Sequence, residues 1–224
     1  MSDVSDVSDV RVVRLSASGA ELAALVPRAS DGRVLLGITG APGAGKSTLA
    51  AHLAAAYGGV VVPMDGFHLA DVELVRRGLL DRKGAPETFD GWGYAALLAR
   101  LRSRPDHVVM APAFERDLEQ PLAGAIPVSP RAGLVVTEGN YLLLDTPEWR
   151  AVRACLDAVW HVEIPASVRV PRLVARHEAF GKSPAAARAW VDRVDEPNAA
   201  LIDAARHRAD LVLELAGWAG TFTG

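Results

Sequence analysis

Residues 40–48 read Gly-Ala-Pro-Gly-Ala-Gly-Lys-Ser-Thr and follow the apolar run at 34–38. They fit the pattern G-x-x-x-x-G-K-[ST] in full, which surrounds phosphate oxygens with backbone N–H groups, a lysine ammonium and a hydroxyl. Lys46 is expected to reach the β and γ phosphates of a nucleotide, and the Ser47 hydroxyl to ligate Mg²⁺. On this stretch alone, the alternative is a glycine-rich turn with an incidental lysine. The predicted nucleotide contacts are Gly40, Ala41, Pro42, Gly43, Ala44, Gly45, Lys46, Ser47 and Thr48.

Two acids, each followed by glycine, stand at the ends of other apolar runs. Asp65 follows the run at 60–64, and Glu138 follows the run at 134–137. We hypothesise that Asp65 accepts the proton of a hydroxyl that attacks the γ-phosphorus. Glu138 is predicted to hold the water shell of Mg²⁺, which takes only one or two protein carboxylates. Each acid could instead cap the helix that follows it.

Three arginines, Arg169, Arg172 and Arg176, recur at spacings of three and four residues. A helix would carry them on one face, where guanidinium groups could hold the oxygens of a transferring phosphoryl group. Their window, residues 167–188, contains Glu178 as its single acid. The alternative is a solvated helix face, although the scarcity of acids in the window speaks against it.

The elements that must position these residues alternate along the chain. Apolar runs predict strands near 33–39, 60–64, 107–111, 134–138, 158–163 and 210–214. Helical spacing predicts helices near 47–57, 68–77, 92–103, 147–155, 166–179, 184–193 and 196–207. The pattern indicates an α/β fold with a mainly parallel sheet and helices on both faces. The long connections at 78–91 and 111–133 are predicted loops, the second with room for a short hairpin.

Composition restricts the class of protein. The chain has 224 residues, half of them hydrophobic, which suits one domain over residues 11–224. Residues 1–10 repeat Ser-Asp-Val without a basic residue, so we expect a disordered tail and no signal peptide. A net charge of −3 argues against nucleic acid, and the apolar runs are too short for a membrane span. The single cysteine, Cys155, suits a reducing compartment and predicts a cytoplasmic protein.

These motifs, in this order, resemble the phosphoribulokinase/uridine kinase superfamily of P-loop kinases, which also contains bacterial pantothenate kinase. The likeness covers roughly residues 33–214. Within the superfamily, the chain is most similar to the bacterial nucleoside/nucleotide kinase-like subgroup, whose members are also named fructose-transport kinases. That subgroup's motifs are matched by Asp65-Gly-Phe-His, by Lys83-Gly-Ala-Pro-Glu-Thr-Phe-Asp90 and by Glu138-Gly-Asn-Tyr-Leu-Leu. The resemblance implies a P-loop NTPase fold, ATP and Mg²⁺ as cofactors, Asp65 as the base and a mobile arginine-rich lid.

Departures from better-defined relatives concern the substrate. Gly66-Phe67-His68 stands where uridine kinases typically have Ser-Phe-Tyr. The chain continues His68-Leu-Ala-Asp71 where pantothenate kinases usually reach a Pro-Asn pair. Leu173 and His177 replace an arginine and an aspartate common in the uridine kinase lid. Asp195 and Asn198 match a subgroup pattern whose residues pack near the nucleotide.

The predicted function is ATP- and Mg²⁺-dependent transfer of the γ-phosphoryl group to a hydroxyl of a small metabolite such as a nucleoside, a sugar or a pantothenate-like compound. The alternative is an ATP-binding regulator or an ATPase; a GTPase would need an Asn-Lys-x-Asp motif, which the sequence lacks. A homodimer is left open. The five tryptophans are too scattered for a stacking platform and are assigned to packing. The candidate substrate contacts are Phe67, His68, Arg82, Lys83, Phe89, Asp90, Arg116 and Tyr141.

Overall fold

A computed structural model describes residues 10–28 and 32–220, so the tail predicted at 1–10 lies almost wholly outside the described residues. None of the helices in these two ranges is long and apolar enough to cross a membrane. The strands are β1 (Val12–Arg14), β2 (Val34–Thr39), β3 (Val60–Pro63), β4 (Val109–Glu115), β5 (Gln120–Val128), β6 (Leu134–Glu138), β7 (Ala158–Glu163) and β8 (Leu211–Glu214). The α-helices are α1 (Leu22–Leu25), α2 (Lys46–Tyr57), α3 (Asp71–Arg77), α4 (Gly91–Arg102), α5 (Pro147–Ala154), α6 (Ala166–Ala179), α7 (Pro184–Trp190) and α8 (Glu196–Ala204).

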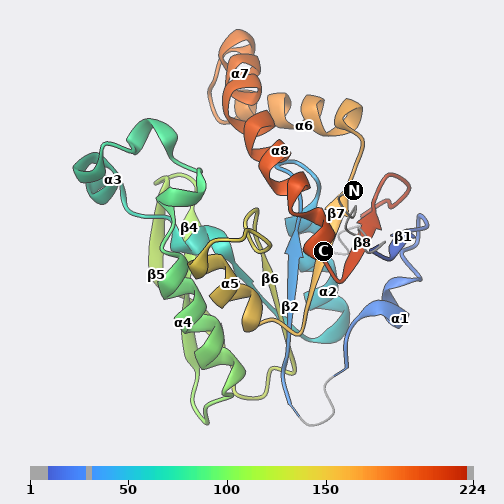
Figure 1. Cartoon of the computed structure of the whole chain (residues 1–224). Coiled ribbons are helices and arrows are strands. Elements are labelled where there is room, and N and C mark those ends of the chain that lie inside the picture. Colours follow the sequence, from blue (N-terminus) through green and yellow to red (C-terminus); the bar gives the residue numbers. More distant parts are fainter. Residues whose placement is uncertain (1–9, 29–31, 221–224) are drawn as a thin grey trace, which may run out of the picture.

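Six strands form one sheet in the order β1-β8-β7-β2-β6-β3 (Figure 1). Every pairing in it is parallel, with Leu36 opposite Val136 between β2 and β6, for example. The mainly parallel sheet predicted from the sequence is therefore confirmed. Since ligands of such sheets bind beyond the carboxyl ends of the strands, the ends of β2, β3 and β6 mark the place of the site.

Helices cover both faces of the sheet because successive strand residues point to opposite sides. Leu35 and Val135 pack with side chains of α4 and α5. Their neighbours Leu36 and Val136 pack with α1 and α2 on the other face. Strands buried on both faces read as continuous apolar runs, which is why their positions were predictable.

One predicted strand belongs elsewhere. The run at 107–111 was expected in the parallel sheet, but β4 pairs antiparallel with β5 in a separate two-stranded sheet. The nine residues of β5, Gln-Pro-Leu-Ala-Gly-Ala-Ile-Pro-Val, fall within the segment expected to be a loop with room for a short hairpin. Its prolines and glycine lower its β propensity, which concealed a strand of this length.

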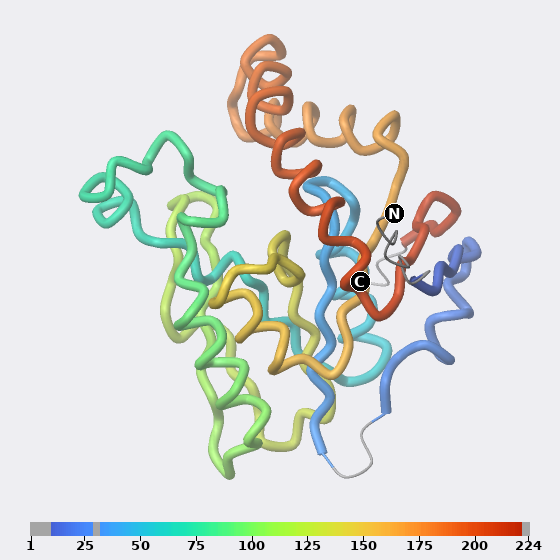
Figure 2. Tube along the Cα trace, in the orientation of Figure 1, coloured from blue at the N-terminus to red at the C-terminus, as the bar shows by residue number. Residues whose placement is uncertain are grey.

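The segment 166–204, here called the lid, stands over the carboxyl edge of the sheet (Figures 1 and 2). It consists of α6, which matches its predicted bounds, then α7, a π-helical turn at Val191–Asp195, and α8. The helix predicted at 184–193 thus gives way to the π turn after Trp190. Short π-helical insertions are often found at functional sites.

Candidate active site

The loop between β2 and α2 has the backbone shape of a phosphate cradle. Gly40, Gly43 and Gly45 adopt φ values of 147°, 78° and 95°, a region that other residues rarely enter. At Gly40, a Cβ atom would lie 2.4 Å from the backbone oxygen of Val162. The loop therefore keeps its shape only with glycine there, and α2 begins directly after it and directs its positive end to the same place.

Lys46 and Ser47 begin α2 and carry the polar groups of the loop. The Lys46 ammonium is buried and donates to the backbone oxygens of Gly40 (2.9 Å) and Ala41 (3.1 Å). Burial lowers the pKa of Lys46 to about 8, against the opposing pull of Glu138 and Asp65.

The Ser47 hydroxyl donates to Oε1 of Glu138 at 3.1 Å. Glu138 is itself buried, and burial first, then the nearby Asp65 carboxylate, raise the pKa of its carboxyl group. A hydroxyl beside a carboxylate at a phosphate-binding loop is a donor set that fits Mg²⁺. Ser47 and Glu138 are therefore the residues that would hold the ion.

The glycine after each acid permits a close contact between elements. A Cβ at Gly66 would lie 2.6 Å from the backbone oxygen of Pro112 in β4. A Cβ at Gly139 would lie 2.4 Å from Cβ of Met64. The hairpin, the 3₁₀ turn Met64–Phe67 and the end of β6 are thus packed tightly, and this packing brings Asp65 and Glu138 to one cavity.

Two adjoining cavities lie beneath the lid. The first, here called the phosphate cavity, measures about 610 Å³ and is lined by residues 42–48, both acids and the chain at 215–220. The second, here called the acceptor cavity, measures about 560 Å³ and lies between the lid, the segment 68–89 and the β4–β5 hairpin. Five residues line both cavities and so form their boundary: Pro42, Asp65, Arg116, Asn140 and Arg176.

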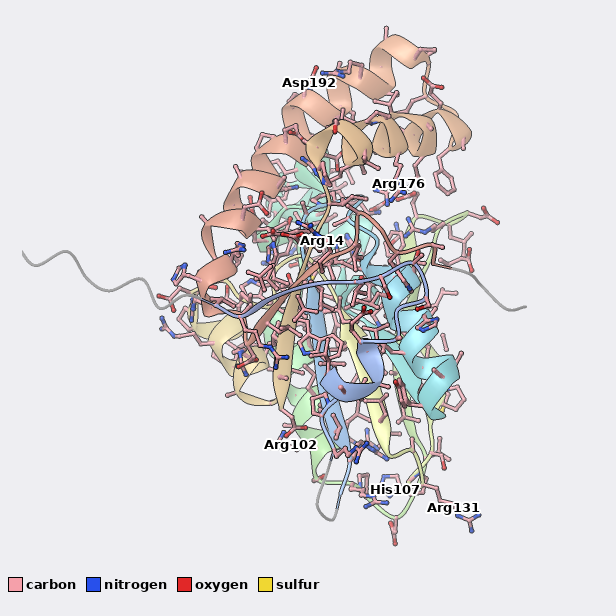
Figure 3. All side chains as sticks on the ribbon, turned by 90° about the vertical axis from the view of Figure 1, so that its right-hand side faces the viewer. Arg14, Arg102, His107, Arg131, Arg176 and Asp192 are labelled. Atoms are coloured by element: carbon pink, nitrogen blue, oxygen red, sulfur yellow. The ribbon has the colours of Figure 1, made fainter. Side chains whose placement is uncertain are left out.

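The three predicted arginines divide into two groups. Arg172 and Arg176 are exposed and line the phosphate cavity, and Figure 3 shows Arg176 between the lid and the body of the protein. Arg169 does not line it. Its side chain is buried, with Nη2 2.7 Å from Oε1 of Glu196 and Nη1 donating to the Pro42 oxygen at 3.4 Å. Seven residues of helix separate Arg169 from Arg176 by roughly 10 Å along the axis, so sharing a face does not bring them to one site.

Four of the predicted substrate contacts line the acceptor cavity, namely His68, Lys83, Phe89 and Arg116. Lys83 is engaged within the protein: its ammonium lies 2.6 Å from Oδ1 of Asp71 and also donates to the backbone oxygen of Glu119. It therefore joins the segment 78–91 to the tip of the hairpin. Arg116 is exposed on that tip.

The other four do not line the acceptor cavity. Phe67 packs against Tyr94 with ring centroids 4.8 Å apart, and Tyr141 is fully buried and donates to the Gly84 backbone oxygen. Arg82 forms an exposed ion pair with Glu87 at 2.6 Å. Asp90 caps α4 by accepting from the Gly93 amide at 2.8 Å. Each of these side chains is thus accounted for by packing, a surface pair or a helix cap.

The structure adds lining residues that were not among the candidates. Asn140 follows Glu138-Gly139 directly, so its place after an apolar strand was a signal that the sequence offered. Trp190 and Trp218, assigned to packing, line the acceptor and phosphate cavities respectively. Asp195 and Asn198, noted only through the resemblance, line the acceptor cavity together with Phe114.

Comparisons with known proteins agree with this architecture. The chain is 32% identical over 195 residues to "Putative uridine kinase C227.14" of Schizosaccharomyces pombe, covering 81% of this chain and 83% of that one. It is 33% identical over 201 residues to "Uncharacterized protein YggC" of Escherichia coli, covering 87% and 83%. The crystal structure of a "putative fructose transport system kinase" from Silicibacter sp. TM1040 shares 43% identity at a TM-score of 0.77, covering 85% and 94%.

A scan against protein-family models found no match. The similarity to these relatives nevertheless extends over more than four fifths of the chain and includes the fold. The chain belongs to the phosphoribulokinase/uridine kinase superfamily of P-loop kinases.

Proposed function

We propose that this protein transfers the γ-phosphoryl group of Mg·ATP to a hydroxyl of a small metabolite. The observation that carries the proposal is the position of Asp65 on the boundary between the phosphate cavity and the acceptor cavity. A general base for this reaction must contact the acceptor hydroxyl while that hydroxyl faces the γ-phosphorus. A carboxylate at the boundary meets both requirements.

Phosphate binding, proton transfer and charge neutralisation are assigned to different side chains. The backbone of residues 40–45 and the Lys46 ammonium bind the phosphates, and Mg²⁺, held by Ser47 and Glu138, supplies charge neutralisation when bound. Asp65 takes the proton as the acceptor oxygen forms its bond to phosphorus and the bond to the ADP oxygen breaks. Arg172 and Arg176 offset the negative charge on the transferring group. All six of these side chains line one cavity.

Water must be excluded, because otherwise ATP would be hydrolysed instead of transferred. The lid carries Arg172 and Arg176 over the loop, and α6 contacts the loop closely. A Cβ at Gly43 would lie 2.8 Å from Cγ of Leu173. This contact between the lid and the phosphate loop supports a role for α6 in closing the site around bound nucleotide.

The test is ADP release from Mg·ATP across a panel of nucleosides, sugars, glycerate and pantothenate, with mass detection of the products. The proposal expects a phosphorylated product with at least one acceptor and its loss in Lys46→Ala. ATP binding with acceptor-independent ADP release, or with none, would favour an ATPase or an ATP-binding regulator.

A further inference from the structure

The part of the acceptor cavity that does not border the phosphate cavity presents hydrogen-bond acceptors. The first is Nε2 of His68. Its other ring nitrogen, Nδ1, lies 2.8 Å from the backbone oxygen of Asp65, and a carbonyl can only accept, so Nδ1 carries the proton. Burial lowers the pKa of His68, which favours the neutral ring. In that tautomer Nε2 is an acceptor, and no side chain or backbone group within 10–28 and 32–220 hydrogen-bonds to it.

The second acceptor is Asp195, which is only 7% exposed. Its Oδ2 lies 2.8 Å from Nε2 of His177 on α6. Its Oδ1 has no hydrogen-bond partner among the residues that the structure describes, although the side chain lines the cavity. Asp195 closes the π turn Val191–Asp195, and Asn198 lines the same cavity one turn later. The lid thus carries a buried carboxylate that His177 orients toward the cavity.

The cations near this part of the cavity are already engaged. Lys83 pairs with Asp71, and the Lys182 ammonium lies 4.6 Å from the centre of the Trp190 ring. The two remaining arginines of the acceptor cavity, Arg116 and Arg176, belong to the boundary with the phosphate cavity. An anionic group bound beside Asp195 would meet a like charge in a buried site, and Arg176, the cation of this cavity that Asp195 influences, is the one that the proposed function assigns to the transferring phosphoryl group.

Aromatic rings form part of the remaining surface. The His68 ring lies 4.0 Å from the Phe89 centroid and 4.7 Å from the Phe114 centroid, and Trp190 lies near His177 at 6.3 Å. Such rings pack against the C–H faces of a sugar ring, while buried acceptors select ligands with matching donors. Aromatic rings beside buried hydrogen-bond acceptors suit neither an apolar nor an acidic substrate.

Resting on the kinase function above, we propose that the acceptor is a neutral polyol, either a free sugar or the sugar of a nucleoside, whose hydroxyls donate to Asp195 and to Nε2 of His68. The hydroxyl beside Asp65 is phosphorylated. Other hydroxyls of the same molecule are bound by Asp195 on the lid and by His68, which follows Phe67. His177 acts as a positioning residue through Asp195.

The test compares Asp195→Asn with the matched control Asp192→Asn. Asn keeps the shape of Asp195 and can still accept from His177, but it offers an N–H donor to the cavity. Asp192 lies in the same π turn, but its side chain is 55% exposed, pairs with Arg188 and lies at the outer end of the lid (Figure 3). With glycerol, D-ribose, D-fructose and uridine as probes, Asp195→Asn is expected to raise the acceptor KM about 10- to 100-fold and to leave the KM for ATP unchanged. Asp192→Asn is expected to match wild type.

Monodeoxy analogues of the best acceptor identify the hydroxyl involved. With wild type, one analogue should show the same rise in KM that the parent acceptor shows with Asp195→Asn. That analogue should show no further rise in KM when it is tested with Asp195→Asn. His68→Phe retains an aromatic ring but removes Nε2. Its rise in KM should match that of a different deoxy analogue, which lacks the hydroxyl that donates to His68. Comparison of KM for the free sugars D-ribose and D-fructose with KM for uridine shows whether the site binds a free sugar or the sugar of a nucleoside.

A preference of wild type for D-glycerate over glycerol, or for pantothenate over every neutral probe, would overturn the inference. An unchanged KM in Asp195→Asn would do so as well. If no acceptor is phosphorylated, saturation-transfer NMR with D-fructose and D-ribose decides. Binding that disappears in Asp195→Asn would keep the polyol site and remove the kinase, whereas absence of binding to every probe would overturn both.

Discussion

The phosphate cavity and the acceptor cavity are built in different ways. The first is centred on nine consecutive residues, 40–48, and on the ends of neighbouring strands, to which the lid adds Arg172 and Arg176. The second is assembled from the segment 68–89, the β4–β5 hairpin and the lid. Individual side chains hold these parts: Lys83 joins the segment 68–89 to the backbone oxygen of Glu119 in the hairpin, and His177 pairs with Asp195 within the lid. The phosphate loop is therefore a local feature of the chain, whereas acceptor choice depends on how distant segments meet.

The difference suggests how specificity can vary while the chemistry is kept. A loop held by glycine geometry against the neighbouring strand tolerates few changes. Side chains on a lid, a hairpin and a connecting segment can change without disturbing that loop. Changes on each side should then affect the ligand of that side, and a change at the boundary should affect catalysis with little effect on the binding of either ligand.

The largest effect is expected at the boundary, in Asp65→Asn. Loss of a general base should lower kcat about 100- to 10,000-fold, while the affinity for Mg·ATP stays within about twofold of wild type. The pH dependence of kcat should change as well, because the group that accepts the proton is gone. Full transfer activity with the wild-type pH profile would remove Asp65 from the mechanism.

On the phosphate side, Gly40→Ala should be severe. The new Cβ would lie 2.4 Å from the Val162 oxygen at a φ of 147°, so the loop must shift. We expect a loss of about 3 kcal/mol in folding free energy and nucleotide binding weakened on the order of 100-fold. Gly58→Ala is the control, since its φ is 62° and a Cβ there would meet no atom within 4 Å. It should cost about 1 kcal/mol and leave binding unchanged, as calorimetry and thermal unfolding would show.

A smaller effect on the same side concerns Lys46. A pKa of about 8 means that the ammonium, protonated at pH 7, is largely neutral at pH 9. Bound phosphates favour the charged form, so binding at pH 9 should take up about one proton and should be about tenfold weaker than at pH 7. Titrations in buffers of different ionisation enthalpy measure the uptake. Lys46→Met should bind weakly at both pH values and take up no proton at pH 9.

On the acceptor side, Lys83→Met removes the contact between the segment 78–91 and the hairpin. The acceptor KM should rise about three- to tenfold, because two walls of the cavity lose the contact between Lys83 and the Glu119 backbone oxygen. The Lys83 side chain is only 16% exposed, so this contact is largely shielded from water. The KM for ATP should not change. Arg82→Met, which breaks an exposed pair with Glu87, is the matched control. Equal effects of the two substitutions on the acceptor KM would refute this role for Lys83.

The same difference explains what the sequence could predict. The loop at 40–48 and the apolar runs that lead to Asp65 and Glu138 are local patterns, and the structure brings all three to one cavity. The positions of β2, β6 and β7 followed from apolar runs that helices cover on both faces. Phosphate binding and catalysis by these residues stay predictions.

The acceptor side could not be predicted in this way. Phe67, Arg82, Asp90 and Tyr141 occupy promising loops, but packing, a surface pair and a cap account for them. Asp195 reaches the cavity through a π turn that helical periodicity does not indicate. The hairpin strand β5 carries prolines and glycine, so the hairpin, whose residues Phe114, Arg116 and Glu119 line the cavity, was not recognisable as two paired strands. Contacts between distant segments leave no local pattern.

The most direct test is a crystal structure of the protein with Mg²⁺ and a non-hydrolysable ATP analogue. The account predicts Mg²⁺ held by Ser47 and Glu138, and a γ-phosphate that contacts Lys46. The Asp65 carboxylate should lie on the side of that phosphate that faces the acceptor cavity, within reach of an attacking hydroxyl. A triphosphate that runs into the acceptor cavity, or a γ-phosphate separated from Asp65 by protein, would contradict it.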